Sequence, residues 1–141
     1  GVERTRLYRG ASKGHGPPPP FEALWADHEG EALLLQEIGK IYFENGYLLK
    51  SDVHERLDYV GVQINFLESI ISSEIAARKS DFAEAIKNAL QQEKEFLFGH
   101  VVNWVPKFVS SALGYAKTDF YKGHLHMLKG FIEQEMELLG D

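Results

Sequence analysis

Apolar residues recur at helical spacing through most of the chain. In residues 31–44 one stripe consists of Leu34, Ile38, Ile41 and Tyr42, at spacings of four, three and one. The sequence ENG that follows predicts a helix ended by Gly46 in a left-handed conformation. A last helix is expected to begin at Thr118 or Asp119, since either side chain can cap its free amides. The apolar positions of this last helix are Tyr121, Leu125, Leu128, Ile132, Met136 and Leu139.

Two further helices are predicted between these ends. Asp52 and Glu55 have the spacing of a capping box, so the most apolar helix is expected to start near Asp52. Apolar residues cover two of its sides, which is typical of the buried centre of a bundle. The same spacing recurs at Asp81 and Glu84, ahead of a third helix.

Prolines indicate where the helical pattern is interrupted. Pro106 has no amide hydrogen and clashes with the preceding turn, so Trp104 is predicted to lie at a bend or at the junction of two helices. Residues 1–20 are rich in Gly and Pro and are expected to form an N-terminal segment and an extended connection. No alternating strand pattern competes, so residues 21–141 are predicted to form an all-α helical bundle.

Composition and charge narrow the classes of function. The chain has 141 residues, 44% of them apolar and 26% charged, as expected for one globular domain. Its net charge is −6, and because residues 1–13 carry +3 the remainder carries −9. An acidic body argues against nucleic acid as a partner and suits a basic one, although it also serves solubility alone. No apolar run is long enough for a membrane span or a signal peptide, which favours the cytoplasm.

Motifs for catalysis or metal binding are missing from the sequence. The absence of cysteine excludes disulfides, thiolate metal sites and thiol nucleophiles. His124 and His126 project about 200° apart on a helix, so they cannot hold one ion together. There is no H-E-x-x-H, phosphate-binding loop or G-x-S-x-G. We therefore expect no catalytic residue, metal or cofactor, and a small hydrolase or metalloenzyme is the remaining enzyme alternative.

Polar residues interrupt the most apolar predicted helix. Asp58 and Tyr59 lie early in it, and Gln63 and Asn65 lie in its middle. A buried polar group left without a hydrogen bond costs about 1–3 kcal/mol. These residues are therefore expected either to form hydrogen bonds that hold the bundle together or to line a binding cleft, and the sequence leaves both interpretations open.

Four stretches of the chain carry a family pattern, and they occur in this order: TRLYRG…GPPPPFEALW, LDYVGVQINFL, FGHVVNWVPKF and DFYKGHLHMLKGFIEQE. Together they resemble the C-terminal part of the TorD/DmsD/NarJ family of chaperones for molybdenum-containing redox enzymes. The first is similar to the family's TRLF-G run and PPYESLY element, and the third to its H-x-x-x-W-x-P-x-F element. Pro19, Pro20, Phe21, Glu22 and Trp25 match the second part of the first stretch.

The resemblance implies a function and a longer protein. It implies a chaperone, not an enzyme, that binds the twin-arginine signal peptide of a molybdenum oxidoreductase precursor and holds the precursor in the cytoplasm for cofactor insertion. It also implies several helices ahead of the first stretch, so the chain is expected to be a fragment or to obtain these helices from elsewhere. The family's D-H-x-x-x-E pattern keeps Asp58 but has Tyr59 and Gln63 in place of His and Glu. Asp58 alone is therefore expected to pair with an arginine of the peptide.

The resemblance also implies which residues contact the peptide. They are Asp58, Tyr59 and Gln63 in a polar groove, with Phe21, Glu22, Trp25, His100 and Trp104 around it. For Phe21 and Trp104, packing in the core is favoured over contact with the peptide, because aromatic residues at helical spacing usually lie inside. The alternative function is a helical adaptor that self-associates as a homodimer with exchanged elements, which would cover apolar surface.

Overall fold

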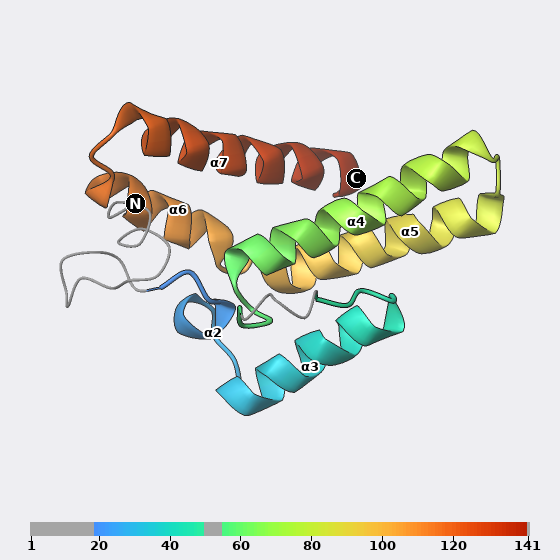
Figure 1. The fold of residues 1–141 in the computed structure, drawn as a ribbon, viewed down its shortest axis with the longest axis horizontal. Coiled ribbons are helices and arrows are strands. Elements are labelled where there is room, and N and C mark those ends of the chain that lie inside the picture. The colour runs from blue at the N-terminus through green and yellow to red at the C-terminus, as the bar shows by residue number, and fades with distance from the viewer. Residues whose placement is uncertain (1–18, 50–54, 141) are drawn as a thin grey trace.

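The computed structural model describes residues 19–49 and 55–140, and every regular element in these ranges is a helix (Figure 1). The elements are α2 (Glu22–Trp25), α3 (Glu31–Glu44), α4 (Val60–Lys79), α5 (Ala83–Phe96), the π-helical turn η1 (Leu97–Val101), α6 (Val105–Tyr115) and α7 (Asp119–Leu139). The predicted all-α class is confirmed. The predicted connection over residues 1–20 lies almost wholly outside the described residues, and the domain division stays a prediction.

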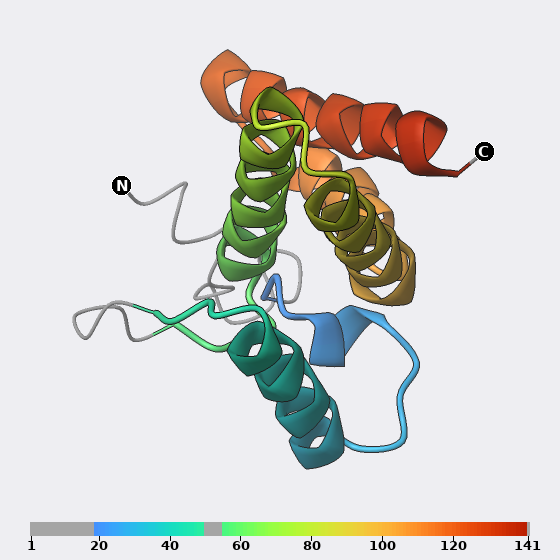
Figure 2. The same ribbon diagram turned by 90° about the vertical axis from the view of Figure 1, so that its right-hand side faces the viewer.

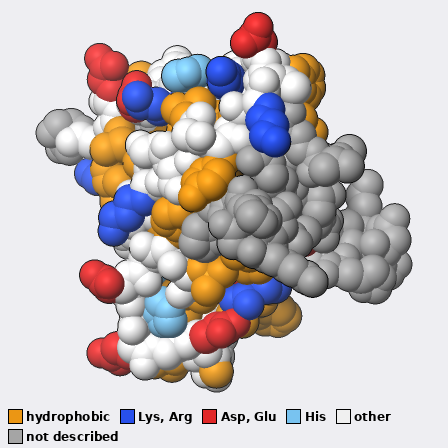
Figure 3. Space-filling view, turned by 90° about the vertical axis from the view of Figure 1, so that its left-hand side faces the viewer, with side chains coloured by type: hydrophobic (Ala, Val, Ile, Leu, Met, Phe, Trp, Pro, Cys, Tyr) orange, Lys and Arg blue, Asp and Glu red, His pale blue; other side chains and the backbone are white. Residues whose placement is uncertain are grey.

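The helices are arranged around an antiparallel hairpin of α4 and α5. The turn η1 continues α5, and α6 then leads to α7, which packs on α6 and also contacts α5 and η1. The two perpendicular views place α7 and α3 on opposite sides of the hairpin (Figures 1 and 2). Apolar, acidic and basic side chains are mixed on the face seen in Figure 3.

An aromatic cluster joins α3 to the hairpin. The Phe66 ring lies 4.7 Å from the ring of Tyr42 and 4.7 Å from that of Phe96, measured between centroids. The Tyr42 hydroxyl donates to the carbonyl of Leu57 at 2.8 Å, and burial raises the pKa of Tyr42. The C-terminal half of α4 is less covered by other helices, since Ile75 is 49% exposed. The buried centre predicted for α4 therefore holds for its first half.

The start of α4 differs from the sequence prediction. The helix begins at Val60, so the start expected near Asp52 is wrong, and Asp52 itself lies outside the described residues. The Val60 amide donates to the carbonyl of Pro20, and the Glu22 amide donates to the carbonyl of Asp58, both at 3.0 Å. The backbone ahead of α4 is therefore paired with a distant segment, and no local pattern reveals that pairing.

Several predicted helix boundaries are confirmed. Gly46 has φ of 67° just after α3, in the left-handed region that favours glycine. At the start of α7, the Thr118 hydroxyl accepts a hydrogen bond from the Tyr121 amide at 3.3 Å. Trp104 lies between η1 and α6, with Pro106 in the first turn of α6. Proline is tolerated there because that amide has no partner within the helix.

The capping box predicted at Asp81 and Glu84 is wrong. Phe82 occupies the cap position of α5 and makes no side-chain cap hydrogen bond. Backbone groups close the turn instead, because the Phe82 amide donates to the carbonyl of Ala77 at 3.0 Å. This turn places Asp81 at φ of 52°, a conformation that aspartate tolerates better than most residues.

Candidate functional site

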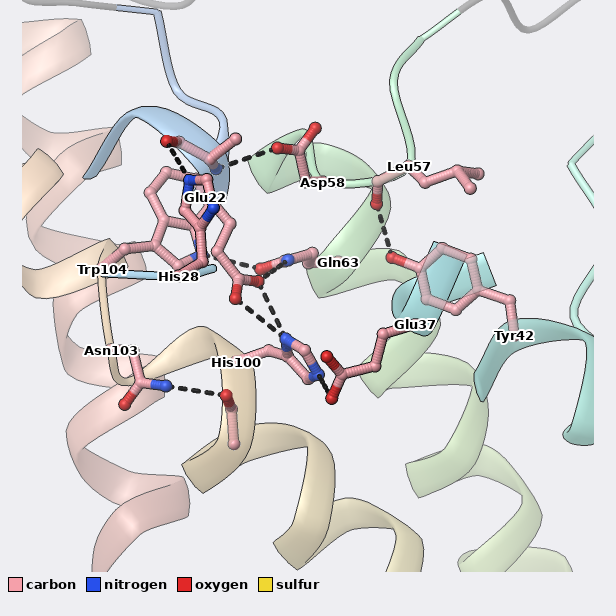
Figure 4. Close-up of polar contacts among 12 residues, drawn as sticks. Glu22, His28, Glu37, Tyr42, Leu57, Asp58, Gln63, His100, Asn103 and Trp104 are labelled. Carbon is pink, nitrogen blue, oxygen red and sulfur yellow. Dashed lines mark hydrogen bonds and ion pairs between the residues drawn. The ribbon is translucent and has the colours of Figure 1, made fainter. Parts of the chain in front are cut away.

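A buried polar network connects α2, α4, η1 and the start of α6 (Figure 4). Gln63 Nε2 donates to Glu22 Oε1 at 2.7 Å, and Trp104 Nε1 donates to Gln63 Oε1 at 2.9 Å. On the other side of the carboxylate, His100 Nδ1 lies 2.9 Å from Glu22 Oε2. All four residues are at most 5% exposed. The network thus joins residues from distant parts of the sequence inside the protein.

The contacts assign the hydrogen-bonding roles in this network. An ionised carboxylate only accepts, so the short contact between Glu22 and His100 places a proton on Nδ1 of the imidazole. The amide of Gln63 uses its nitrogen toward Glu22 and its oxygen toward Trp104, which fixes its orientation. Both polar ends of the Gln63 amide are therefore satisfied, as burial requires.

The π-helical turn positions two members of the network. His100 lies within η1, and Trp104 occupies the cap position of α6 four residues later. Such turns are rare and occur frequently at functional sites. Asn103 supports this segment, because its Nδ2 donates to the carbonyl of Gly99 at 2.7 Å. The sequence indicated a break at this place through Pro106 but did not indicate the π geometry.

Asp58 lies next to the network and is fully buried. Its carboxylate accepts from the Ala23 amide at 3.0 Å and from Arg56 Nε at 2.9 Å and Nη2 at 3.1 Å. It therefore caps α2, since Phe21 at the cap position makes no side-chain hydrogen bond. Its hydrogen bond raises the pKa of Arg56, which also contacts Glu31 at 2.6 Å and lies 4.5 Å from the centroid of the Phe21 ring. The arginine paired with Asp58 is thus the chain's own.

Aromatic side chains hold the segment ahead of α2 on the bundle. Phe21 forms an isolated antiparallel bridge with Tyr59, and their ring centroids are 6.0 Å apart. Trp25 Nε1 donates to the carbonyl of Pro19 at 2.9 Å, and its ring meets the Phe108 ring edge-on at 5.8 Å. Phe21, Tyr59 and Trp25 are each half-buried. These contacts hold residues 19–25 against the bundle.

The structure differs from the open groove expected for the predicted peptide-binding residues. Asp58, Gln63 and Trp104 have no exposed surface, because their polar atoms are paired with other parts of the chain. Asp58 and Gln63 therefore form hydrogen bonds that hold the bundle together, which is one of the two roles expected for them. Trp104 packs in the core. Contact of the predicted set with a peptide stays a prediction.

A pocket of about 240 Å³ opens beside Glu22 and His100. No Lys or Arg is among the residues that line it. Its charged and titratable lining consists of Glu22, Asp27, Glu29, Glu37, His28 and His100. The sequence interpretation missed Asp27, Glu29 and Glu37, although ADHEGE directly after Trp25 concentrates acidic residues around a histidine.

Hydrogen bonds shape one wall of this pocket. His28 Nε2 lies 2.8 Å from the carbonyl oxygen of Ala23, and the Gly30 amide donates to His28 Nδ1 at 3.1 Å. His28 thus holds the loop between α2 and α3 in place. On the opposite side, His100 Nε2 faces Glu37 Oε1 at 3.9 Å, which is too long for a hydrogen bond (Figure 4).

Within residues 19–49 and 55–140, no group of three or more His, Asp or Glu side chains is arranged to hold a metal ion. No helix in the same ranges is long and apolar enough to cross a membrane.

Comparisons with known proteins place the chain among chaperone-related sequences. The profile of the family described as nitrate reductase delta subunit matches residues 2–110. The chaperone protein TorD of Vibrio cholerae serotype O1, strain M66-2, is 21% identical over 126 residues, which are 86% of this chain and 54% of that protein. TorD of the El Tor strain N16961 is 21% identical over 106 residues, 75% of this chain and 47% of that protein. The chain thus spans about half the length of the curated relatives it matches, and no solved structure matches it.

Proposed function

Because the chain belongs to the nitrate reductase delta subunit family, to which the TorD chaperones are related, we propose that it is a maturation chaperone for a molybdenum-containing redox enzyme. The family resemblance drawn from the sequence is confirmed by this membership. In the proposal the chain carries out no catalysis. It binds the twin-arginine signal peptide of the enzyme precursor in the cytoplasm and holds the precursor until its cofactor is inserted.

One observation carries the proposal: three of the sequence stretches that resemble the family converge on one network. The first stretch supplies Glu22, the second supplies Gln63, and the third supplies His100 and Trp104. The motifs lie far apart in the sequence, so packing of neighbouring residues does not explain their meeting. A shared location supports a shared role for these motifs in the function of the family.

The chemistry beside the network suits a signal peptide. Such a peptide combines paired arginines with an apolar stretch, so its site needs carboxylates and exposed apolar surface. The pocket supplies carboxylates, and Leu24 and Leu33 lie close by in the sequence with 52% and 53% of their surfaces exposed. Apolar burial would supply most of the affinity, whereas charge would set the register and the association rate.

The predicted peptide-binding residues divide into two groups in this proposal. Asp58, Gln63 and Trp104 position α2 and η1, since their side chains are buried and paired. Phe21, Tyr59 and Trp25 are half-buried and offer aromatic surface to the peptide. Glu22 and His100 connect both groups, because they belong to the network and also line the pocket. The peptide is therefore expected to contact the protein beside the network.

Calorimetric titration tests this function. The chain is titrated with a twin-arginine leader peptide from a molybdoenzyme precursor and with the same peptide carrying alanine at both arginines, after circular dichroism has verified folding. Binding that depends on the arginines supports the chaperone function. A folded chain that binds neither peptide contradicts it, and self-association in light scattering would then favour the helical adaptor with exchanged elements.

A further inference from the structure

We propose that the pocket beside Glu22 and His100 is a subsite for an arginine side chain of the bound peptide. The identity of the peptide rests on the proposed function. The pocket's own residues favour a guanidinium group. No residue of this pocket other than Glu22 and His100 was expected from the sequence to take part in binding.

The charge of the pocket favours a cation. Four carboxylates line it, and the only other titratable side chains in the lining are two histidines. One carboxylate, Glu22, is 3% exposed and lies in surroundings of low dielectric constant, where attraction to a cation is stronger than in water. Figure 3 shows acidic side chains around a histidine at the lower end of the view, at the level of α3.

The geometry at His100 leaves a place for one hydrogen-bond donor. Its Nδ1 proton is directed at Glu22, so when the ring carries a single proton Nε2 presents a lone pair. That lone pair faces Glu37 Oε1 at 3.9 Å, and Nε2 has no hydrogen bond to any described residue. Two acceptors that face each other need a donor between or beside them.

A guanidinium group matches this requirement better than other common cations. It is planar, always charged, and carries five N–H donors in a fixed fork, so two of them can reach Nε2 of His100 and the carboxylate of Glu37. The nearby Arg56 cannot serve, because Asp58 and Glu31 already hold its guanidinium group. The place is thus open to a donor from another molecule.

The size of the pocket fits one side chain. About 240 Å³ is below the ~300–1,000 Å³ that is usual for sites of whole small molecules. Leu33 and Leu34 are also part of the lining and offer apolar surface to the methylene groups of an arginine. A single guanidinium-bearing side chain is thus the ligand that agrees with volume, charge and hydrogen bonding together.

The first test uses the pocket's ligand without the rest of the peptide. N-acetyl-arginine amide is titrated into the chain while the ring protons of His100 are followed by NMR, with N-acetyl-citrulline amide as the uncharged control. The expected result is a saturable shift of the His100 signals with the arginine compound and not with the citrulline compound. Equal responses to both compounds, or none, would overturn the subsite.

The second test uses matched substitutions on α3. Glu37→Gln removes the carboxylate that faces His100, whereas Glu44→Gln removes an exposed carboxylate on the same helix that does not line the pocket. Glu37→Gln should weaken binding of the twin-arginine leader about tenfold, the usual size of one charge-assisted hydrogen bond. Glu44→Gln should leave the affinity for the leader unchanged. Neither substitution should change the affinity for the alanine-substituted leader.

The outcomes of these tests distinguish a failure of the proposed subsite from a failure of the proposed function. If the leader binds through its arginines but Glu37→Gln and Glu44→Gln have equal effects, the subsite is wrong and the chaperone function stands. If the leader does not bind but the arginine compound shifts His100 in the parent chain and not in Glu37→Gln, the subsite stands and the proposed function fails. Failure of both ligands overturns both.

Discussion

Glu22 and His100 lie 78 positions apart in the sequence, yet the Glu22 Oε2 and His100 Nδ1 atoms are separated by 2.9 Å inside the protein. This contact joins the four-residue helix α2 to the π-helical turn η1. Two segments that are individually short and irregular are thereby held in one arrangement, and the pocket lies beside them.

Replacing Glu22 with glutamine should destabilise the fold. The variant keeps the shape of the side chain but loses the charge and one acceptor that His100 and Gln63 share. Hydrogen bonds to charged groups contribute about 1.5–3 kcal/mol, so the free energy of unfolding in urea should fall by about 2 kcal/mol. Glu44→Gln, at an exposed position, should stay within about 0.5 kcal/mol of the parent. Equal stability of the two variants would contradict the role given to Glu22.

The hydrogen bond donated by the indole nitrogen of Trp104 should contribute to stability independently of the volume of the ring. Trp104→Ala should cost about 3–5 kcal/mol, because the side chain is fully buried. Trp104→Phe keeps most of the volume but leaves Gln63 Oε1 without its donor, which should cost about 1–3 kcal/mol. Chemical denaturation of both variants checks this order. A Trp104→Phe variant as stable as the parent would mean that the hydrogen bond contributes nothing.

Asp58→Asn should loosen α2, which an exposed peptide-binding residue would not do. The carboxylate caps the helix through the Ala23 amide and holds Arg56, so the variant should exchange the Ala23 amide hydrogen faster than the parent. The expected loss of stability is about 0.5–2 kcal/mol. In a double-mutant cycle, Arg56→Gln and Asp58→Asn should show less than additive effects. Additive effects would contradict the coupling of the pair.

Stability should depend on pH through Glu93 on α5. Burial, a hydrogen bond with Glu74 and the charges of Glu74 and Glu135 raise the pKa of Glu93 to about 8, and Arg78 opposes this shift. A carboxyl group with a raised pKa binds more protons in the folded than in the unfolded state. The free energy of unfolding should therefore fall as the pH rises from the ordinary value near 4.5 to about 8, and this contribution should level off above it.

Glu93→Gln isolates this effect. The amide remains neutral at every pH, so the variant should lose this slope between pH 4.5 and 8 and should be more stable than the parent at the alkaline end. Urea denaturation at a series of pH values measures both quantities. A parent and a variant with parallel pH profiles would show that Glu93 does not carry the dependence.

Local patterns predicted the helices well where local physics determines them. Apolar spacing placed α3 and α7, Gly46 and Thr118 were identified at their ends, and Pro106 located the junction at Trp104. These features depend on residues within one or two turns, so a single sequence reveals them. The two capping boxes failed because tertiary contacts and backbone turns determine the starts of α4 and α5.

The candidate site could be predicted only in part. Motif resemblance identified Glu22, Gln63, His100 and Trp104 but not that their side chains meet, because burial and contact depend on how distant segments pack. Asp58 was expected to pair with an arginine of the signal peptide, but in the structure its carboxylate is paired with the chain's own Arg56, only two positions away. The acidic residues of the pocket were missed because no motif includes them.

The most direct measurement for the account as a whole is hydrogen–deuterium exchange of the chain alone and with saturating twin-arginine leader. Added protection is expected in residues 22–37 and 97–104, which contain the pocket and all of the network except Gln63, and no change is expected at the turn between α4 and α5. Protection confined to other helices, or bound leader without protection in these two segments, would contradict it.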